Sequence, residues 1–178
     1  MKYLLDASAL LPLVTGHGKQ LLVEASQERL VTTELALYEA CNGLWKLAAL
    51  LDTLSLKDAV DTATILRDLV ERDAIQALDF ANMDLPDTLT KAYEEQLTFY
   101  DASYISAAGS SQSILVTEDE KLLKVARKFV EAITYGDFEN KKNLRARESK
   151  TSTSDRSNQA ETIPRNLTSA SPTTKQQF

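Results

Sequence analysis

Four acidic residues are the side chains of this chain best suited to chemistry: Asp6, Glu39, Asp101 and Asp119. Asp6 and Asp119 each come just after a short apolar run, whereas Glu39 and Asp101 fall within helical patterns. Carboxylates are costly to gather in one place unless a cation compensates their charge. If the four converge, they form a site for Mg²⁺ or Mn²⁺, and such a site points to cleavage of phosphodiester bonds.

Each acid also has a purely structural explanation, and the local sequence alone does not decide between that explanation and a metal site. An aspartate after a strand caps the turn or helix that follows, and this applies to Asp6 and Asp119. Asp101 stands at a predicted helix start, where aspartate is a favoured N-cap. Glu39 shares a polar helical stripe with Asn42, and polar stripes are usually solvated. The order of the four acids therefore carries more information than any one of them.

Hydroxyl groups accompany two of these acids. Ser8 follows Asp6 by two residues, and it either caps the local turn or holds a metal-bound water or a phosphate. Thr117 precedes Asp119 by two residues, so a hydroxyl and a carboxylate lie just beyond a predicted strand end, near the point where Asp6 emerges. Glu34, by contrast, fits the first turn of its helix, where the helix dipole favours negative charge.

Composition excludes several classes of site. The chain of 178 residues has one cysteine, Cys41, so it has no intramolecular disulfide and no thiolate zinc cluster. Its one histidine, His17, excludes Ser-His-Asp hydrolases, His-rich zinc sites and most histidine acid–base schemes. Any chemistry must therefore rely mainly on oxygen ligands.

Strand-like and helical patterns alternate through residues 1–138. The predicted strands cover residues 2–5, 29–32, 75–78, 113–117 and 132–134. The predicted helices cover residues 19–27, 33–51, 56–72, 85–97, 101–108 and 120–129. This alternation indicates an α/β fold in which helices cover both faces of a parallel sheet. Ligands of such folds bind beyond the carboxyl ends of the strands, where Asp6 and Asp119 are expected.

Charge is unevenly distributed along the chain. Residues 139–178 hold eight Lys and Arg against four Asp and Glu, whereas residues 1–138 hold twelve against twenty-two, a net charge of −10. The basic segment is rich in Ser and Thr and poor in large apolar residues, so we expect a disordered tail after a folded domain at 1–138. The tail either contacts RNA phosphates or only solubilises the domain.

The predicted helix at 120–129 carries Lys121, Lys124 and Lys128 on one face. This face is either solvated or an edge that contacts phosphates. The N-terminal apolar stretch is interrupted by Asp6 and is too short to span a bilayer, so we expect a cytoplasmic protein without a membrane anchor.

The order of these motifs resembles the PIN domain family, and within it the VapC-type ribonuclease toxins of prokaryotic toxin–antitoxin pairs. The resemblance covers roughly residues 2–135. The motifs that carry it are Asp6-x-Ser8, then Glu39-x-x-Asn42-x-Leu44, then Tyr100-Asp101-Ala102, and then Leu115-Val116-Thr117-x-Asp119. Residues 139–178 have no counterpart in the family pattern.

The resemblance implies a three-layer α/β/α fold and a Mg²⁺- or Mn²⁺-dependent endoribonuclease that cleaves single-stranded RNA. Asp6 and Asp101 match the principal metal ligands, and Glu39 and Asp119 complete the acidic pocket. The polar positions that support the site are matched by Ser8, Asn42 and Thr117. The resemblance also implies a homodimer and a small antitoxin protein laid across the active-site groove. Candidate contacts for both partners are the apolar helical segments 44–51 and 56–70.

Three other functions compete with this prediction. A haloacid-dehalogenase-like phosphatase needs a second acid where this chain has Ser8, and a receiver-like domain needs an adjacent acidic pair near Asp6. The remaining alternative is a PIN-like RNA-processing, RNA-binding or regulatory module with weak or no nuclease activity. The net charge of residues 1–138 leaves that alternative open.

Overall fold

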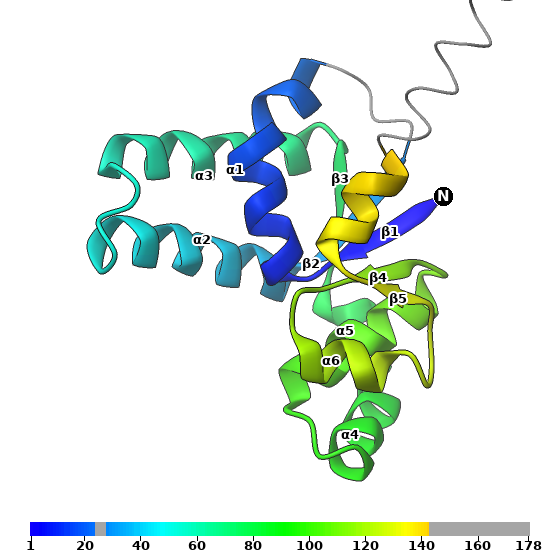
Figure 1. Ribbon diagram of the computed structural model, residues 1–178. Helices are drawn as coiled ribbons and strands as arrows, with labels where there is room; N and C mark the ends of the chain where they lie inside the picture. The colour runs from blue at the N-terminus through cyan, green and yellow to red at the C-terminus, as the bar shows by residue number, and fades with distance from the viewer. Residues whose placement is uncertain (24–27, 143–178) are drawn as a thin grey trace, which may run out of the picture. The chain divides into compact units, whose positions relative to one another are not determined.

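The computed structural model describes residues 1–23 and 28–142. Within them, five parallel strands form one sheet in the order β3-β2-β1-β4-β5. The strands are β1 (Lys2–Leu5), β2 (Arg29–Thr33), β3 (Ile75–Leu78), β4 (Ile114–Val116) and β5 (Ala132–Ile133). The predicted α/β class with a parallel sheet is confirmed. Because β1 and β4 are neighbours in the sheet, the chain emerges after both strands at the same edge (Figure 1).

Helices cover both faces of this sheet, which gives the three layers that the family resemblance implies. The helices are α1 (Ala7–Val23), α2 (Glu34–Ala49), α3 (Leu56–Glu71), α4 (Leu85–Glu94), α5 (Phe99–Ser110) and α6 (Glu120–Ala126), with a short 3₁₀ turn η1 (Phe80–Asn82). α1 packs against α2 and α3 on one side, whereas α5 packs against α4 and α6 on the other (Figure 1). Connections between parallel strands are right-handed. The chain adds β2 and β3 on one side of β1 and then adds β4 and β5 on the other side, so the helices before and after this change lie on opposite faces of the sheet.

The central strands are apolar from Tyr3 to Leu5 in β1 and throughout β4, because both faces of the sheet are covered there. Leu4, Leu5, Leu115 and Val116 have no measurable exposure. Continuous apolar strands of this kind are typical of parallel sheets between two helical layers. The first polar residue after β1, Asp6, therefore lies at the boundary between the core and solvent.

One predicted helix was misplaced at its start. The helix expected at residues 19–27 begins at Ala7, immediately after Asp6. Pro12, Gly16 and Gly18 weaken the helical pattern of this segment. Packing explains the helix: a Cβ at Gly18 would lie only 2.8 Å from Cγ2 of Ile65 on α3, so glycine permits the close approach of these two helices.

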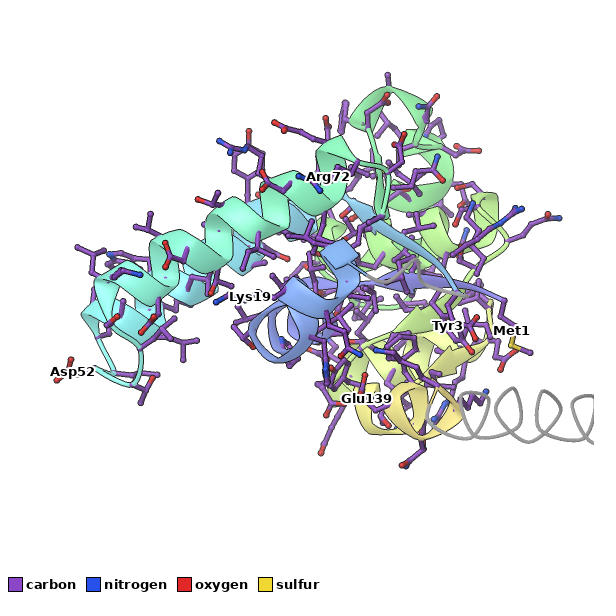
Figure 2. The ribbon with its side chains drawn as sticks, turned by 90° about the horizontal axis from the view of Figure 1, so that it is seen from above. Met1, Tyr3, Lys19, Asp52, Arg72 and Glu139 are labelled. Atoms are coloured by element: carbon purple, nitrogen blue, oxygen red, sulfur yellow. The ribbon has the colours of Figure 1, made fainter. Side chains whose placement is uncertain are left out.

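The helices α2 and α3 form an antiparallel hairpin that extends away from the sheet, with Asp52 in the turn between them (Figure 2). Near this turn, apolar side chains of the two helices line a shallow groove of about 400 Å³. Trp45, Leu56 and Val60 are exposed there. In the described part of the chain, no helix has the length and hydropathy that crossing a membrane requires.

Residues 135–142 are helical and follow β5 directly. Phe138 of this segment is buried against Tyr3 of β1, with ring centroids 5.0 Å apart in a T-shaped contact. Glu139 approaches α1, where one of its carboxylate oxygens lies 3.3 Å from Nε2 of His17. The compact unit that contains Phe138 ends at Glu139, and residues 143–178 of the predicted tail lie outside the described residues.

Candidate active site

Asp6 has a buried carboxylate held by three hydrogen bonds. Its side chain is only 4% exposed. The Ser8 hydroxyl donates to Oδ1 at 2.7 Å, and the backbone N–H of Ala9 donates to the same oxygen at 2.9 Å. The Thr117 hydroxyl donates to Oδ2 at 2.5 Å. Asp6 therefore caps the start of α1 through the N–H of Ala9. It is also held by Thr117, which lies 111 positions later in the chain.

Burial raises the pKa of the Asp6 carboxyl above its ordinary value of 3.8. The hydrogen bonds from Thr117, Ser8 and Ala9 lower the pKa, but they offset only part of the effect of burial. The ionised form of a buried carboxylate gains from a nearby cation, since the surroundings screen charge poorly. The site thus favours a positive partner at Asp6.

Strand β4 brings Thr117 and Asp119 to the same edge. The backbone N–H of Asp6 donates to the carbonyl of Val116 at 3.2 Å, which sets the two strand ends side by side. The Thr117 hydroxyl accepts from the N–H of Asp119 at 3.0 Å. Oδ1 of Asp119 accepts from the N–H of Leu122 at 2.7 Å, so this exposed acid is the N-cap of α6.

A second part of the site joins α2 to α5. The Tyr104 hydroxyl donates to Oε2 of Glu39 at 2.5 Å. Tyr104 is only 3% exposed, and burial raises its pKa well above the usual tyrosine range, with further contributions from the hydrogen bond to Glu39 and from the charges of Glu39 and Asp6. Tyr104 therefore remains a hydrogen-bond donor and lies within the electrostatic reach of both acids.

Asp101 lies in the first turn of α5, three residues before Tyr104. Thr98 is the N-cap of this helix, because its hydroxyl accepts from the N–H of Asp101 at 3.1 Å. The N-cap explanation for Asp101 is therefore wrong. Residues three apart share one face of a helix, so Asp101 neighbours the tyrosine that binds Glu39. Its side chain is partly buried.

Tyr104 is the residue of this site that the sequence analysis missed. Its only sequence signal is its spacing of three residues from Asp101. Asn42, predicted to support the site, is exposed on α2, and within the described residues it makes no side-chain hydrogen bond to another predicted site residue. Glu34, predicted to lie apart from the acids, accepts from the N–H of Phe80 at 3.2 Å and so holds η1.

The donor set fits a hard divalent cation, because it consists of carboxylates and hydroxyls at the carboxyl end of a parallel sheet. Within residues 1–23 and 28–142, no three His, Cys, Asp or Glu side chains are close enough to form a ready-made cation cluster. Mg²⁺ commonly uses one or two carboxylates and completes its octahedron with water and substrate phosphate. Direct coordination of the cation by Asp6 and one further acid is consistent with this coordination of Mg²⁺.

The raised pKa of Asp6 has a consequence for stability. Between pH 3.8 and the raised value of the folded protein, the folded state holds a proton more tightly than the unfolded state. Stability contributed by this group therefore falls as pH rises through that window. We expect the stability of Asp6→Asn relative to the wild type to increase over the same window in metal-free protein.

Urea denaturation in EDTA, from about pH 4 to about pH 8, measures this difference. Its slope with pH is the diagnostic quantity, because the altered hydrogen bonds to Ser8 and Thr117 add a constant offset. A difference that stays flat or falls with rising pH would contradict the account of Asp6.

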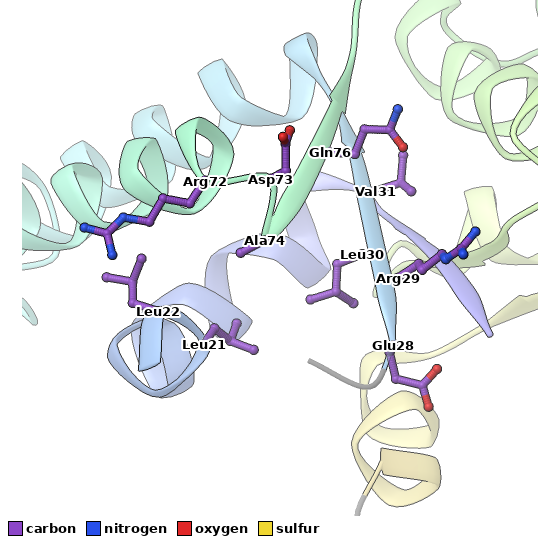
Figure 3. Close-up of a pocket in the computed structure, with 10 residues that line it drawn as sticks. All are labelled: Leu21, Leu22, Glu28, Arg29, Leu30, Val31, Arg72, Asp73, Ala74 and Gln76. Carbon is purple, nitrogen blue, oxygen red and sulfur yellow. The ribbon is translucent and has the colours of Figure 1, made fainter. Parts of the chain in front are cut away.

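A cavity of about 810 Å³ lies at the other end of the sheet, beside the amino ends of β2 and β3 (Figure 3). Its lining includes Leu21, Glu28, Arg29, Arg72 and Asp73. None of the predicted site residues contributes to it. The candidate site is therefore a patch at the carboxyl edge and is separate from this cavity.

Comparison with known proteins identifies the family of the chain. The family model of the PIN domain matches residues 3–128. The chain is 39% identical over 124 residues to a Pyrobaculum aerophilum protein named Exonuclease VapC9, which covers 69% of this chain and 84% of that protein. It is 30% identical over 138 residues to Ribonuclease VapC3 of the same organism, which covers 75% of this chain and 99% of that protein.

A solved structure with a similar fold is the crystal structure of PAE2754 from Pyrobaculum aerophilum. It superposes with a TM-score of 0.61 at 29% sequence identity, and the match covers 81% of this chain and 90% of that one. The family match spans the four predicted acids and ends before residues 135–142. The chain therefore belongs to the PIN domain family, and within that family its resemblance is to the proteins named VapC.

Proposed function

We propose that this chain is a Mg²⁺- or Mn²⁺-dependent endoribonuclease that cleaves single-stranded RNA in the cytoplasm, as the toxin of a toxin–antitoxin pair. The observation that carries the proposal is the buried Asp6 carboxylate, fixed by Ser8 and Thr117 at the carboxyl edge of the sheet. The names of the two curated relatives support a nuclease. The donor chemistry supports a divalent cation.

In this proposal Asp6 and Asp101 hold the cation, and Glu39 and Asp119 complete the acidic pocket. A bound divalent cation supplies a water of lowered pKa and compensates charge on the phosphorane-like transition state. No histidine is then required.

The remaining polar residues keep the acids in position. Ser8 and Thr117 orient both oxygens of Asp6, since each hydroxyl donates to a different oxygen. Tyr104 orients Glu39 because its hydroxyl donates to Oε2 of that residue. Asn42 lies one helical turn from Glu39, and in this proposal its amide lines the edge of the acidic pocket without a direct hydrogen bond to the acids.

The proposed partners are a second copy of the chain and a small antitoxin protein. The exposed apolar groove at the α2–α3 hairpin supports a protein contact, because exposed apolar surface of this kind usually marks an interface. Trp45 is the one tryptophan of the chain and is exposed in that groove. Its emission therefore reports directly on coverage of the groove.

We expect the emission maximum of Trp45 to shift to longer wavelength as the purified chain is diluted and a homodimer dissociates. The single-site variant Leu56→Lys places a charge in the same groove and should give the long-wavelength spectrum at every concentration. Leu89→Lys, an exposed leucine on α4, is the matched control. A spectrum that is unchanged on dilution while sedimentation shows dissociation would place the dimer contact elsewhere.

The alternative is a PIN-like RNA-processing, RNA-binding or regulatory module with weak or no nuclease activity. The net charge of −10 over residues 1–138 leaves it open, because such a surface repels the polyanionic substrate that a ribonuclease must hold. Thermal stability with and without Mn²⁺, followed by incubation with a mixed pool of single-stranded RNA, separates the two functions. Stabilisation with cleavage supports the nuclease, and stabilisation without cleavage supports the binding module.

A further inference from the structure

Tyr100 is a large aromatic residue that remains exposed beside the candidate site. It lies in the first turn of α5, directly before Asp101, and 59% of its surface is accessible. The same helix buries every residue from Ala102 to Ala108. The ring of Tyr100 is thus presented to solvent by a helix that is otherwise anchored in the core.

Its position relative to the site follows from helical periodicity. Tyr100 precedes Tyr104 by four residues, so the two rings lie on one face of α5. The Tyr104 hydroxyl donates to Glu39, which fixes this face of α5 against α2. Tyr100 and Asp101 therefore lie one turn from the hydrogen bond that joins the two helices, at the rim of the proposed pocket.

The negative charge of the domain makes an uncharged contribution to RNA binding valuable. Residues 1–138 carry a net charge of −10, so contacts with phosphates alone would bind RNA poorly. Stacking of a base on an aromatic ring contributes affinity without positive charge and tolerates every base. It also requires an unpaired base, since bases within a duplex are already stacked.

We propose that Tyr100 is the residue on which an unpaired base of the RNA stacks, next to the phosphodiester that the site cleaves. The proposal rests on the proposed function and deepens it, because it assigns the preference for single strands to a particular side chain. Tyr100 contacts the substrate base and takes no part in the bond-breaking step. Its hydroxyl is dispensable for stacking.

The test uses the purified full chain, a short labelled single-stranded RNA and Mn²⁺. We expect Tyr100→Ala to raise KM about tenfold, with a smaller effect on kcat. Tyr100→Phe should retain the wild-type KM because it keeps the ring. Tyr93→Ala removes a tyrosine that is 82% exposed on α4 and is the matched control, for which we expect no change.

A second arm identifies the base itself. The same RNA is prepared with one abasic position at a time, and each version is assayed with the wild type and with Tyr100→Ala. We expect one position at which loss of the base raises the wild-type KM by the same factor as Tyr100→Ala, with no further rise when both changes are combined. A purely structural role for Tyr100 would not produce this coupling.

The outcomes separate the stacking proposal from the proposed function. A wild-type protein that cleaves RNA, together with a Tyr100→Ala variant of unchanged KM, overturns stacking alone. If the wild type does not cleave RNA, the proposed function fails, and fluorescence anisotropy with the same intact and abasic RNAs tests stacking by itself. Weakened self-association in Tyr100→Ala with unchanged RNA kinetics would assign the side chain to a protein contact and also overturn stacking.

Discussion

Replacement of Asp6 or Asp101 by asparagine is expected to reduce metal-dependent RNA cleavage by a factor of about 10³ or more while the fold remains intact. Loss of a cation that supplies several kcal/mol of transition-state stabilisation gives an effect of this size, because each 1.4 kcal/mol corresponds to a factor of ten. Asparagine keeps the size of the side chain but removes its charge. Circular dichroism and urea denaturation establish that each variant is folded before its rate is measured.

The matched control for this prediction is Asp84→Asn. Asp84 is the N-cap of α4, where its side chain accepts from the N–H of Asp87, and asparagine is an equally good cap. We therefore expect its stability and its cleavage rate to equal those of the wild type. Full activity in either purified site variant would refute the assignment of that acid to the metal site.

Replacement of Phe138 by alanine is expected to lower the free energy of unfolding by about 3–4 kcal/mol. Phe138 is only 1% exposed and contacts Tyr3 of β1 edge to face, with Tyr135 at a centroid distance of 6.0 Å. Its removal leaves a cavity against the central strand β1, directly before Asp6 in the chain. Since domains of this size are stable by about 5–15 kcal/mol, the loss is a large share of the total.

Urea denaturation measures this loss, with Phe129→Ala as the control. Phe129 is 43% exposed, so its truncation should cost less than about 1 kcal/mol. A Phe138→Ala variant within about 1 kcal/mol of the wild type would mean that the helical segment 135–139 contributes little to the domain. That result would mean that the folded domain ends before Phe138.

The strands were predictable from sequence because each is a short segment centred on apolar residues and separated from the next by a helical pattern. The predicted strands at 2–5 and 75–78 coincide with β1 and β3. The start of α1 was not predictable in this way. Its glycines and its proline disfavour a helix locally, and the helix is stabilised by packing on α3 and by the capping of Ala9 by Asp6.

The part of the candidate site that follows β1 and β4 was predictable, because the two strands are neighbours in the sheet. Residues that leave adjacent parallel strands must emerge together, and Asp6 indeed accepts a hydrogen bond from Thr117. The role of Tyr104 was not predictable, because its partner Glu39 lies 65 residues away on another helix. Convergence of all four acids on one cation stays a prediction.

Incubation of the wild type with a covalently closed circle of single-stranded RNA tests the central claim most directly. A circle has no ends, so only cleavage within the strand can open it. We predict that the circle is linearised in the presence of Mn²⁺, remains closed in EDTA, and remains closed with Asp101→Asn in Mn²⁺. Linearisation in EDTA or by Asp101→Asn, or an intact circle beside a linear RNA that is shortened from its ends, would contradict the account.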